Sequence, residues 1–226
     1  MKWRMTRSWT RNESVKIKIP FLGDFFVKNK TSWYTENMFK DILFPSQGKD
    51  SYSLIRVIFW IFLIYYSLRF FSFGINTAVM NDFLHGPNLI FHEAGHVIFS
   101  PFGDFITILG WSLWQCLMPI IVMYTFLFKE KNAFGASIWL WWLGQNLTDV
   151  ALYISDASAR SLPLIGGMGE EAHDWGNLLT MTGLLRYDFT IGIITHYIGM
   201  ILMILALIWW YYIHTNAYIG SGEKPS

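Results

Sequence analysis

The residues best suited to chemistry are two histidines and a glutamate in the segment His92-Glu93-Ala94-Gly95-His96. On an α-helix, His92 and His96 lie one turn apart on the same face, so both imidazoles can reach a single Zn²⁺. Glu93 then stands beside the open position of the metal, where it can take a proton from zinc-bound water and pass it to a leaving amine. The spacing predicts a zinc site with His92 and His96 as metal ligands and Glu93 as the catalytic base.

The surroundings of this segment are apolar, because residues 89–91 read Leu-Ile-Phe and residues 97–99 read Val-Ile-Phe. Ionisable side chains are costly in such a setting and are usually functional. The alternative is that His92, Glu93 and His96 only form hydrogen bonds to neighbouring helices, but such a network does not need this spacing.

A zinc site needs at least one more protein ligand, and one source is a polar row further along the chain. Asn146, Asp149, Tyr153 and Asp156 follow one another at i, i+3, i+7 and i+10, which places them on one face of a helix that is apolar elsewhere. A row of this kind faces the interior of a bundle, another polar group or a metal. The row is either a polar seam between helices or the source of a third ligand, Asp149 or Asp156.

The other source of a third ligand is the glycine-rich segment 166–176, which also carries acidic residues. His173 in this segment is a candidate metal ligand. Asp174 follows it directly and is expected to orient His173 or a neighbouring ligand through an outer hydrogen bond. The alternative for His173 is an exposed loop histidine beside an interfacial tryptophan, Trp175.

The elements that must position these residues are membrane helices. The chain has 226 residues, of which 53% are hydrophobic and only 15% charged, against about 25% charged residues in soluble proteins. About 20 apolar residues are needed to cross a bilayer as a helix, and four segments meet that length: 53–73, 105–128, 133–154 and 189–213. A fifth stretch, 88–101, is shorter and is bounded by Gly86-Pro87 and by Pro101, which predicts a short embedded helix. The expected fold is all-α, a polytopic transmembrane bundle of four long spans plus this short HExxH helix.

Three regions follow from this pattern: a basic, aromatic arm on the membrane surface (1–50), a transmembrane helical domain with the metal site (51–215) and a polar tail (216–226). The basic arm places the N-terminus in the cytoplasm by the positive-inside rule. A net charge of +1 argues against nucleic acid as a partner. The single cysteine, Cys116, excludes a disulfide framework and a thiolate metal cluster within the chain.

The H-E-A-G-H segment in a membrane helix resembles the site-2-protease family of intramembrane zinc metalloproteases. It looks closest to small bacterial membrane proteins with this segment, a tryptophan-rich span ending in N-x-x-D and a later H-D-W loop, and the similarity covers residues 85–178. The resemblance implies Zn²⁺ held by His92, His96 and an aspartate, with Glu93 as general base. It also implies a bacterial inner-membrane location and cleavage of a peptide bond within or near the bilayer.

The resemblance assigns roles to the polar row as well. Asn146 corresponds to the asparagine of the family's N-x-x-P…D-G motif, which helps to hold substrate, and Asp156 or Asp149 corresponds to its aspartate. This sequence lacks the proline after Asn146 and has Ala157 where the family has glycine. His173 is therefore kept as an alternative to the aspartate.

Two functions of different classes fit these observations. The first is a membrane-embedded zinc metallopeptidase that hydrolyses a peptide bond of a membrane-anchored protein through metal-activated water. The second is a non-catalytic, metal-containing membrane subunit that scaffolds a protein complex, which the small size and the lack of a substrate-recognition domain favour. A transporter is less well supported, because the sequence has no internal repeat of the inverted type.

Overall fold

The computed structural model describes residues 42–43, 54–73, 75, 80–162 and 173–221. From residue 54 on, these contain six α-helices and two short 3₁₀ helices: α2 (Leu54–Phe73), α3 (His85–Phe99), η3 (Ser100–Phe102), α4 (Asp104–Phe128), α5 (Ala133–Ser155), α6 (Asp174–Met181), η6 (Leu185–Tyr187) and α7 (Asp188–Ser221). The predicted all-α fold is confirmed for this part of the chain. The expected surface arm lies outside the described residues except for residues 42–43.

Three of the helices are long and apolar enough to cross a membrane. The segments are Leu54–Phe71, Asp104–Phe128 and Leu185–Thr215, the last of which starts in η6 and continues through α7. They correspond to three of the four predicted spans. α5, with 23 residues, is one residue longer than the predicted span 133–154, but it is not among the three. Its polar residues lower its hydropathy, so by length and composition the described chain offers three spans rather than four.

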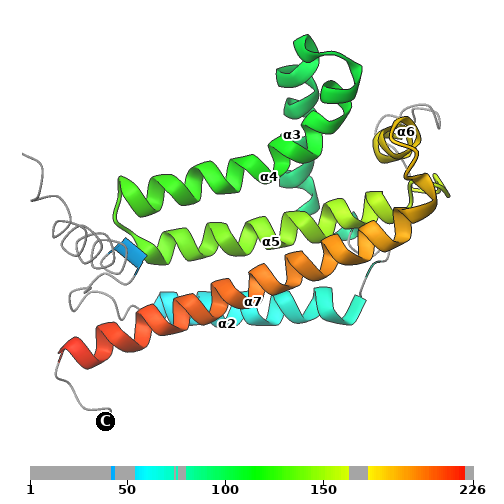
Figure 1. Cartoon of the computed structure of the whole chain (residues 1–226). Coiled ribbons are helices and arrows are strands. Elements are labelled where there is room, and N and C mark those ends of the chain that lie inside the picture. Colours follow the sequence, from blue (N-terminus) through cyan, green and yellow to red (C-terminus); the bar gives the residue numbers. More distant parts are fainter. Residues whose placement is uncertain (1–41, 44–53, 74, 76–79, 163–172, 222–226) are drawn as a thin grey trace, which may run out of the picture. The chain divides into compact units, whose positions relative to one another are not determined.

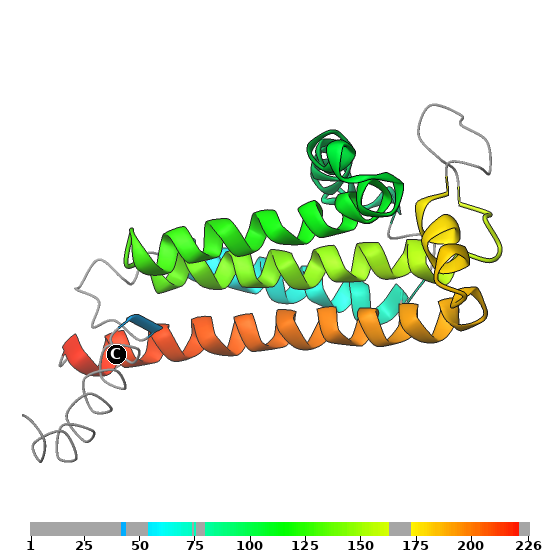
Figure 2. The same ribbon diagram turned by 45° about the horizontal axis from the view of Figure 1, so that its top comes forward.

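α5 lies between α4 and α7 (Figures 1 and 2), and most of its residues are buried. The packing against α7 is close. A Cβ atom added at Gly144 of α5 would lie 2.5 Å from the backbone oxygen of Gly199 of α7, a distance that folded proteins do not tolerate. The glycines therefore let the two backbones approach, and the polar side chains of α5 are enclosed by protein.

α2 packs against the same bundle through aromatic residues. The indole N–H of Trp141 on α5 donates a hydrogen bond to the Ser67 hydroxyl on α2, at 2.8 Å. Further toward the start of α2, Trp60 stacks on Trp210 of α7 with ring centroids 5.1 Å apart. These contacts fix α2 beside α5 and α7.

α3 is the short helix predicted around 88–101. It begins three residues earlier than expected, at His85, with Gly86 and Pro87 in its first turn, where proline needs no backbone N–H partner. Figure 1 shows α3 running across the direction of α5 and α7. Its outer side carries exposed apolar residues such as Val97, which is 76% exposed.

Candidate metal centre

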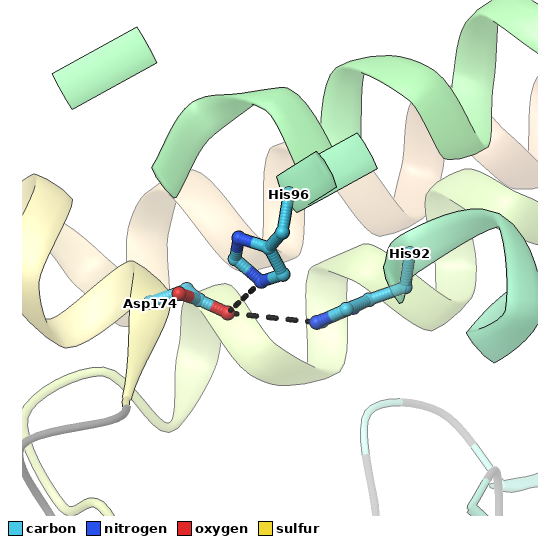
Figure 3. Close-up of side chains that lie close together, drawn as sticks. All are labelled: His92, His96 and Asp174. Carbon is cyan, nitrogen blue, oxygen red and sulfur yellow. Dashed lines mark ion pairs between the residues drawn. The ribbon is translucent and has the colours of Figure 1, made fainter. Parts of the chain in front are cut away.

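α3 presents its two histidines to a carboxylate from another helix. The Nε2 atoms of His92 and His96 lie 3.5 Å and 3.4 Å from the Oδ2 atom of Asp174, the first residue of α6 (Figure 3). One ligand atom from each of the three side chains lies within 4.8 Å of the other two. In the described part of the chain, this is the one group of histidine, cysteine or acidic residues that meets this criterion.

The spacing of these atoms fits a metal better than a hydrogen-bonded cluster. Charge-assisted N–H···O hydrogen bonds have lengths of about 2.7–2.9 Å, shorter than the distances at Asp174. Neighbouring ligand atoms around a tetrahedral zinc with bonds of about 2.0–2.1 Å stand about 3.3 Å apart. Two imidazole nitrogens and one carboxylate oxygen are also a donor set that catalytic zinc uses, with a fourth position left open.

Asp174 is suited to this role because it stays ionised. Burial by itself raises its pKa, but the polar contacts with the His92 and His96 rings and the charges of both rings bring the net pKa below its usual range. The carboxylate is also at the N-terminal end of α6, where the helix dipole favours negative charge. Asp174 therefore presents a carboxylate to both imidazoles near neutral pH.

His92 is further fixed by aromatic neighbours. Its ring centroid is 4.1 Å from that of Trp111 on α4 and 6.3 Å from that of Tyr153 on α5. Trp111 is fully buried, so its ring is fixed by packing and restricts the orientation of the imidazole. The His92 ring is thus held by three helices, while His96 is more exposed.

Gly95 sets the distance between α3 and α4. A Cβ atom at this position would lie 2.5 Å from both the carbonyl oxygen of Gly110 and the Cα atom of Trp111. These are backbone atoms and cannot turn aside, so any larger residue pushes α3 away from the helix that supports His92. The glycine of the H-E-A-G-H segment is explained by this close approach.

We expect Gly95→Ala to lower the stability of the protein by about 1–3 kcal/mol, the usual cost of overpacking, and to weaken zinc binding by displacing α3. Thermal unfolding in detergent and a zinc competition assay measure the two effects. Gly86→Ala is the matched control, because a Cβ at Gly86, on the same helix, meets nothing within 4 Å. Equal behaviour of the two variants would contradict this account of Gly95.

His173 and Asp156, two of the ligands expected from the sequence, pair with each other instead of joining the group. The backbone N–H of Gly176 donates to Nδ1 of His173, so Nε2 carries the proton and donates to Oδ2 of Asp156, at 3.0 Å. His173 is the N-cap of α6, directly before Asp174. The pair anchors the start of α6 to the end of α5, so both residues help to position Asp174.

Asp156 has a full set of hydrogen-bond partners in this anchor. It accepts from the backbone N–H and hydroxyl of Ser161, the backbone N–H of Leu162 and the His173 ring. Burial raises the pKa of Asp156, but the Ser161 hydroxyl, the Leu162 N–H and His173 together lower it below its usual range. The anionic form is therefore the one that the fold stabilises.

We expect Asp156→Ala to lower the free energy of unfolding by about 1–3 kcal/mol or more, because it leaves buried donors without an acceptor. The folded-state pKa of Asp156 is lowered, so its stabilisation is complete above the unfolded value of about 3.9 and is lost as the pH falls through the folded value. Unfolding measured at pH 7 and below pH 4 should show the difference from wild type shrinking in acid. Asp104→Ala, an exposed aspartate, is the control and should change little at either pH.

Asp149, the remaining expected ligand, forms hydrogen bonds away from the three-residue group. Its carboxylate is 2% exposed and accepts hydrogen bonds from Nδ1 of His85 at 2.8 Å, Nδ2 of Asn88 at 3.3 Å and Nε2 of Gln115 at 3.0 Å. These partners come from α3 and α4. Asp149 therefore acts as a buried junction of three helices, which agrees with the polar-seam reading of its row.

The last two residues predicted for the site are placed as follows. Glu93 follows His92 on α3, and its side chain is exposed and outside the three-residue group. Asn146 is fully buried, and its Nδ2 donates to the carbonyl of Trp142 at 3.1 Å. Its Oδ1 has no hydrogen-bond partner among the residues that are described.

The structure brings together the two histidines expected as metal ligands. The carboxylate beside them is Asp174, expected to orient a ligand, while His173 and Asp156, expected as ligands, pair with each other. The available signal was an acidic residue at the start of a short helix, after a residue able to cap it. Comparisons with protein-family models, with curated proteins and with solved structures find no match to this chain.

Proposed function

We propose that this protein is a zinc-dependent peptidase of a membrane that hydrolyses a peptide bond of a membrane-associated protein. The observation that carries the proposal is the convergence of His92, His96 and Asp174, at distances that suit a tetrahedral metal, on a helix with the H-E-x-x-H spacing. When bound, zinc supplies a Lewis acid that polarises a carbonyl and lowers the pKa of water.

The residues of this chain have separate tasks in the proposal. His92, His96 and Asp174 hold the ion, and the Trp111 ring packed against His92 keeps that imidazole in place. Glu93 lies next to a ligand on the same helix with an accessible carboxylate, so it can take a proton from water and deliver it to the leaving amine. No covalent nucleophile is required.

The position of the three-residue group along the helices supports cleavage of a peptide bond near the membrane surface. Tyr153, a neighbour of His92, lies in the last turn of α5, and Asp174 comes from the helix that precedes α7. The group is thus level with one end of the helices that we place across the membrane. In this proposal α5 is the fourth span, shielded from lipid by its neighbours, and α3 is embedded without crossing.

The test is metal analysis of the purified protein together with a cleavage assay. The probe is a pool of peptides with one transmembrane anchor and randomised, quenched fluorogenic residues beside it. We expect about one zinc per chain, cleavage of part of the pool, loss of cleavage with a chelator and recovery with added zinc. Stoichiometric zinc without cleavage would favour the non-catalytic subunit, and absence of zinc would overturn the site itself.

A further inference from the structure

A second site lies between α2 and α7, apart from the metal centre. A cavity of about 460 Å³ opens there, within the range of about 300–1,000 Å³ that small-molecule sites occupy. Its wall includes Phe71 and Ile75 on the α2 side and Phe189, Ile193, His196 and Met200 on α7. Tyr197, which is largely exposed, also borders the cavity, and His196 is its one buried polar side chain.

His196 is the unusual member of this wall. The residue is 5% exposed and lines the cavity. Its Nδ1 atom is buried inside the protein, so the nitrogen left to face the cavity is Nε2, which has no hydrogen-bond partner among the described residues. A polar group left without a hydrogen-bond partner in such a setting is costly, and so is burying an ionisable residue among apolar ones. A bound molecule with a hydrogen-bonding group would remove this cost.

The position of His196 along α7 restricts the charge of such a molecule. His196 is eight residues after Asp188, the first residue of α7, which corresponds to about 12 Å along a helix. A hydrocarbon core is about 30 Å thick, so with Asp188 at the membrane surface the imidazole lies well inside it. An ionic headgroup is too costly to bury at that depth, which leaves a neutral polar group.

We propose that this cavity binds a neutral, membrane-soluble alcohol with a long apolar body, whose hydroxyl group pairs with the imidazole of His196. A neutral imidazole has one donor and one acceptor nitrogen. A hydroxyl group both donates and accepts, so it can pair with whichever nitrogen faces it. The apolar body contacts Phe71, Ile193 and Met200, and Phe189 is exposed at the mouth, so the molecule enters from the lipid.

The test is photolabelling of the full chain in lipid nanodiscs with a long-chain alcohol that carries a diazirine, compared with the alkane probe of the same length. We expect the alcohol to label residues 189–200 at concentrations at which the alkane does not. His196→Leu should reduce this labelling at least about tenfold, the factor for 1.4 kcal/mol, and His196→Gln, which keeps hydrogen-bonding capacity, should retain it. His214→Leu on the same helix is the matched control and should label like wild type.

Phe71→Trp provides a second variant that leaves His196 unchanged and narrows the cavity, and it should also lose labelling. Equal labelling by the alcohol and the alkane, or unchanged labelling of His196→Leu, would overturn the proposal. The readout needs neither zinc nor cleavage, so this site and the peptidase assignment can fail independently of each other.

Discussion

Replacing Asp174 with alanine is expected to lower zinc affinity by more than about 100-fold, beyond the roughly 10–100-fold loss that changes to outer partners of metal ligands cause. The reason is that Asp174 is the only carboxylate whose oxygen lies within reach of both imidazoles among the described residues. Zinc competition with a chromogenic chelator measures the affinity directly. The metal-free variant should also lose some stability at neutral pH, because the lowered pKa of Asp174 means that its carboxylate stabilises the folded state.

Two comparison variants make the result specific to this carboxylate. Asp104→Ala changes an exposed aspartate at the start of α4 and should bind zinc like wild type. Asp149→Asn changes the buried junction and should keep zinc within about tenfold, because no histidine of the group contacts Asp149. If zinc affinity fell more in the Asp149 variant than in the Asp174 variant, the third ligand would have to be Asp149, in the polar row of α5.

The histidine pair could be predicted from sequence because its geometry is local. Residues four apart on a helix share a face whatever surrounds them, so His92 and His96 needed only a helix, and the apolar residues around them indicated one. The same local rule found the polar row of Asn146 and Asp149. Helix periodicity states which residues share a face, and it does not state which other helix that face meets.

The carboxylate of the group could not be predicted because it depends on how distant helices pack. Asp174 is 78 positions after His96 in the sequence, and the Asp156–His173 pair and the hydrogen bond from Trp175 to Ser112 on α4 hold the start of α6 near α3. Two adjacent residues, His173 and Asp174, point to different partners. Of these two, the sequence made His173 a candidate ligand beside Asp149 and Asp156, and it gave Asp174 an outer, orienting role.

The status of α5 has a related physical reason. Hydropathy describes how a helix would fare in lipid, whereas most of α5 contacts protein. Asp149 is acceptable there because three donors surround its carboxylate, and the glycine contact with α7 excludes lipid from that side. A helix of this kind can be central to a membrane bundle while being less apolar than the helices around it.

Glu93→Gln is expected to keep about one zinc per chain and to lower peptide cleavage by at least about 100-fold, the smaller end of the effect of a general acid–base group. The amide has nearly the same size as the carboxylate but cannot take up a proton, and Glu93 lies outside the group that holds the metal. Glu130→Gln, in the exposed turn before α5, is the matched control. Cleavage by the Glu93 variant at the wild-type rate, with zinc bound, would remove Glu93 as the base and leave the metal site to a structural role.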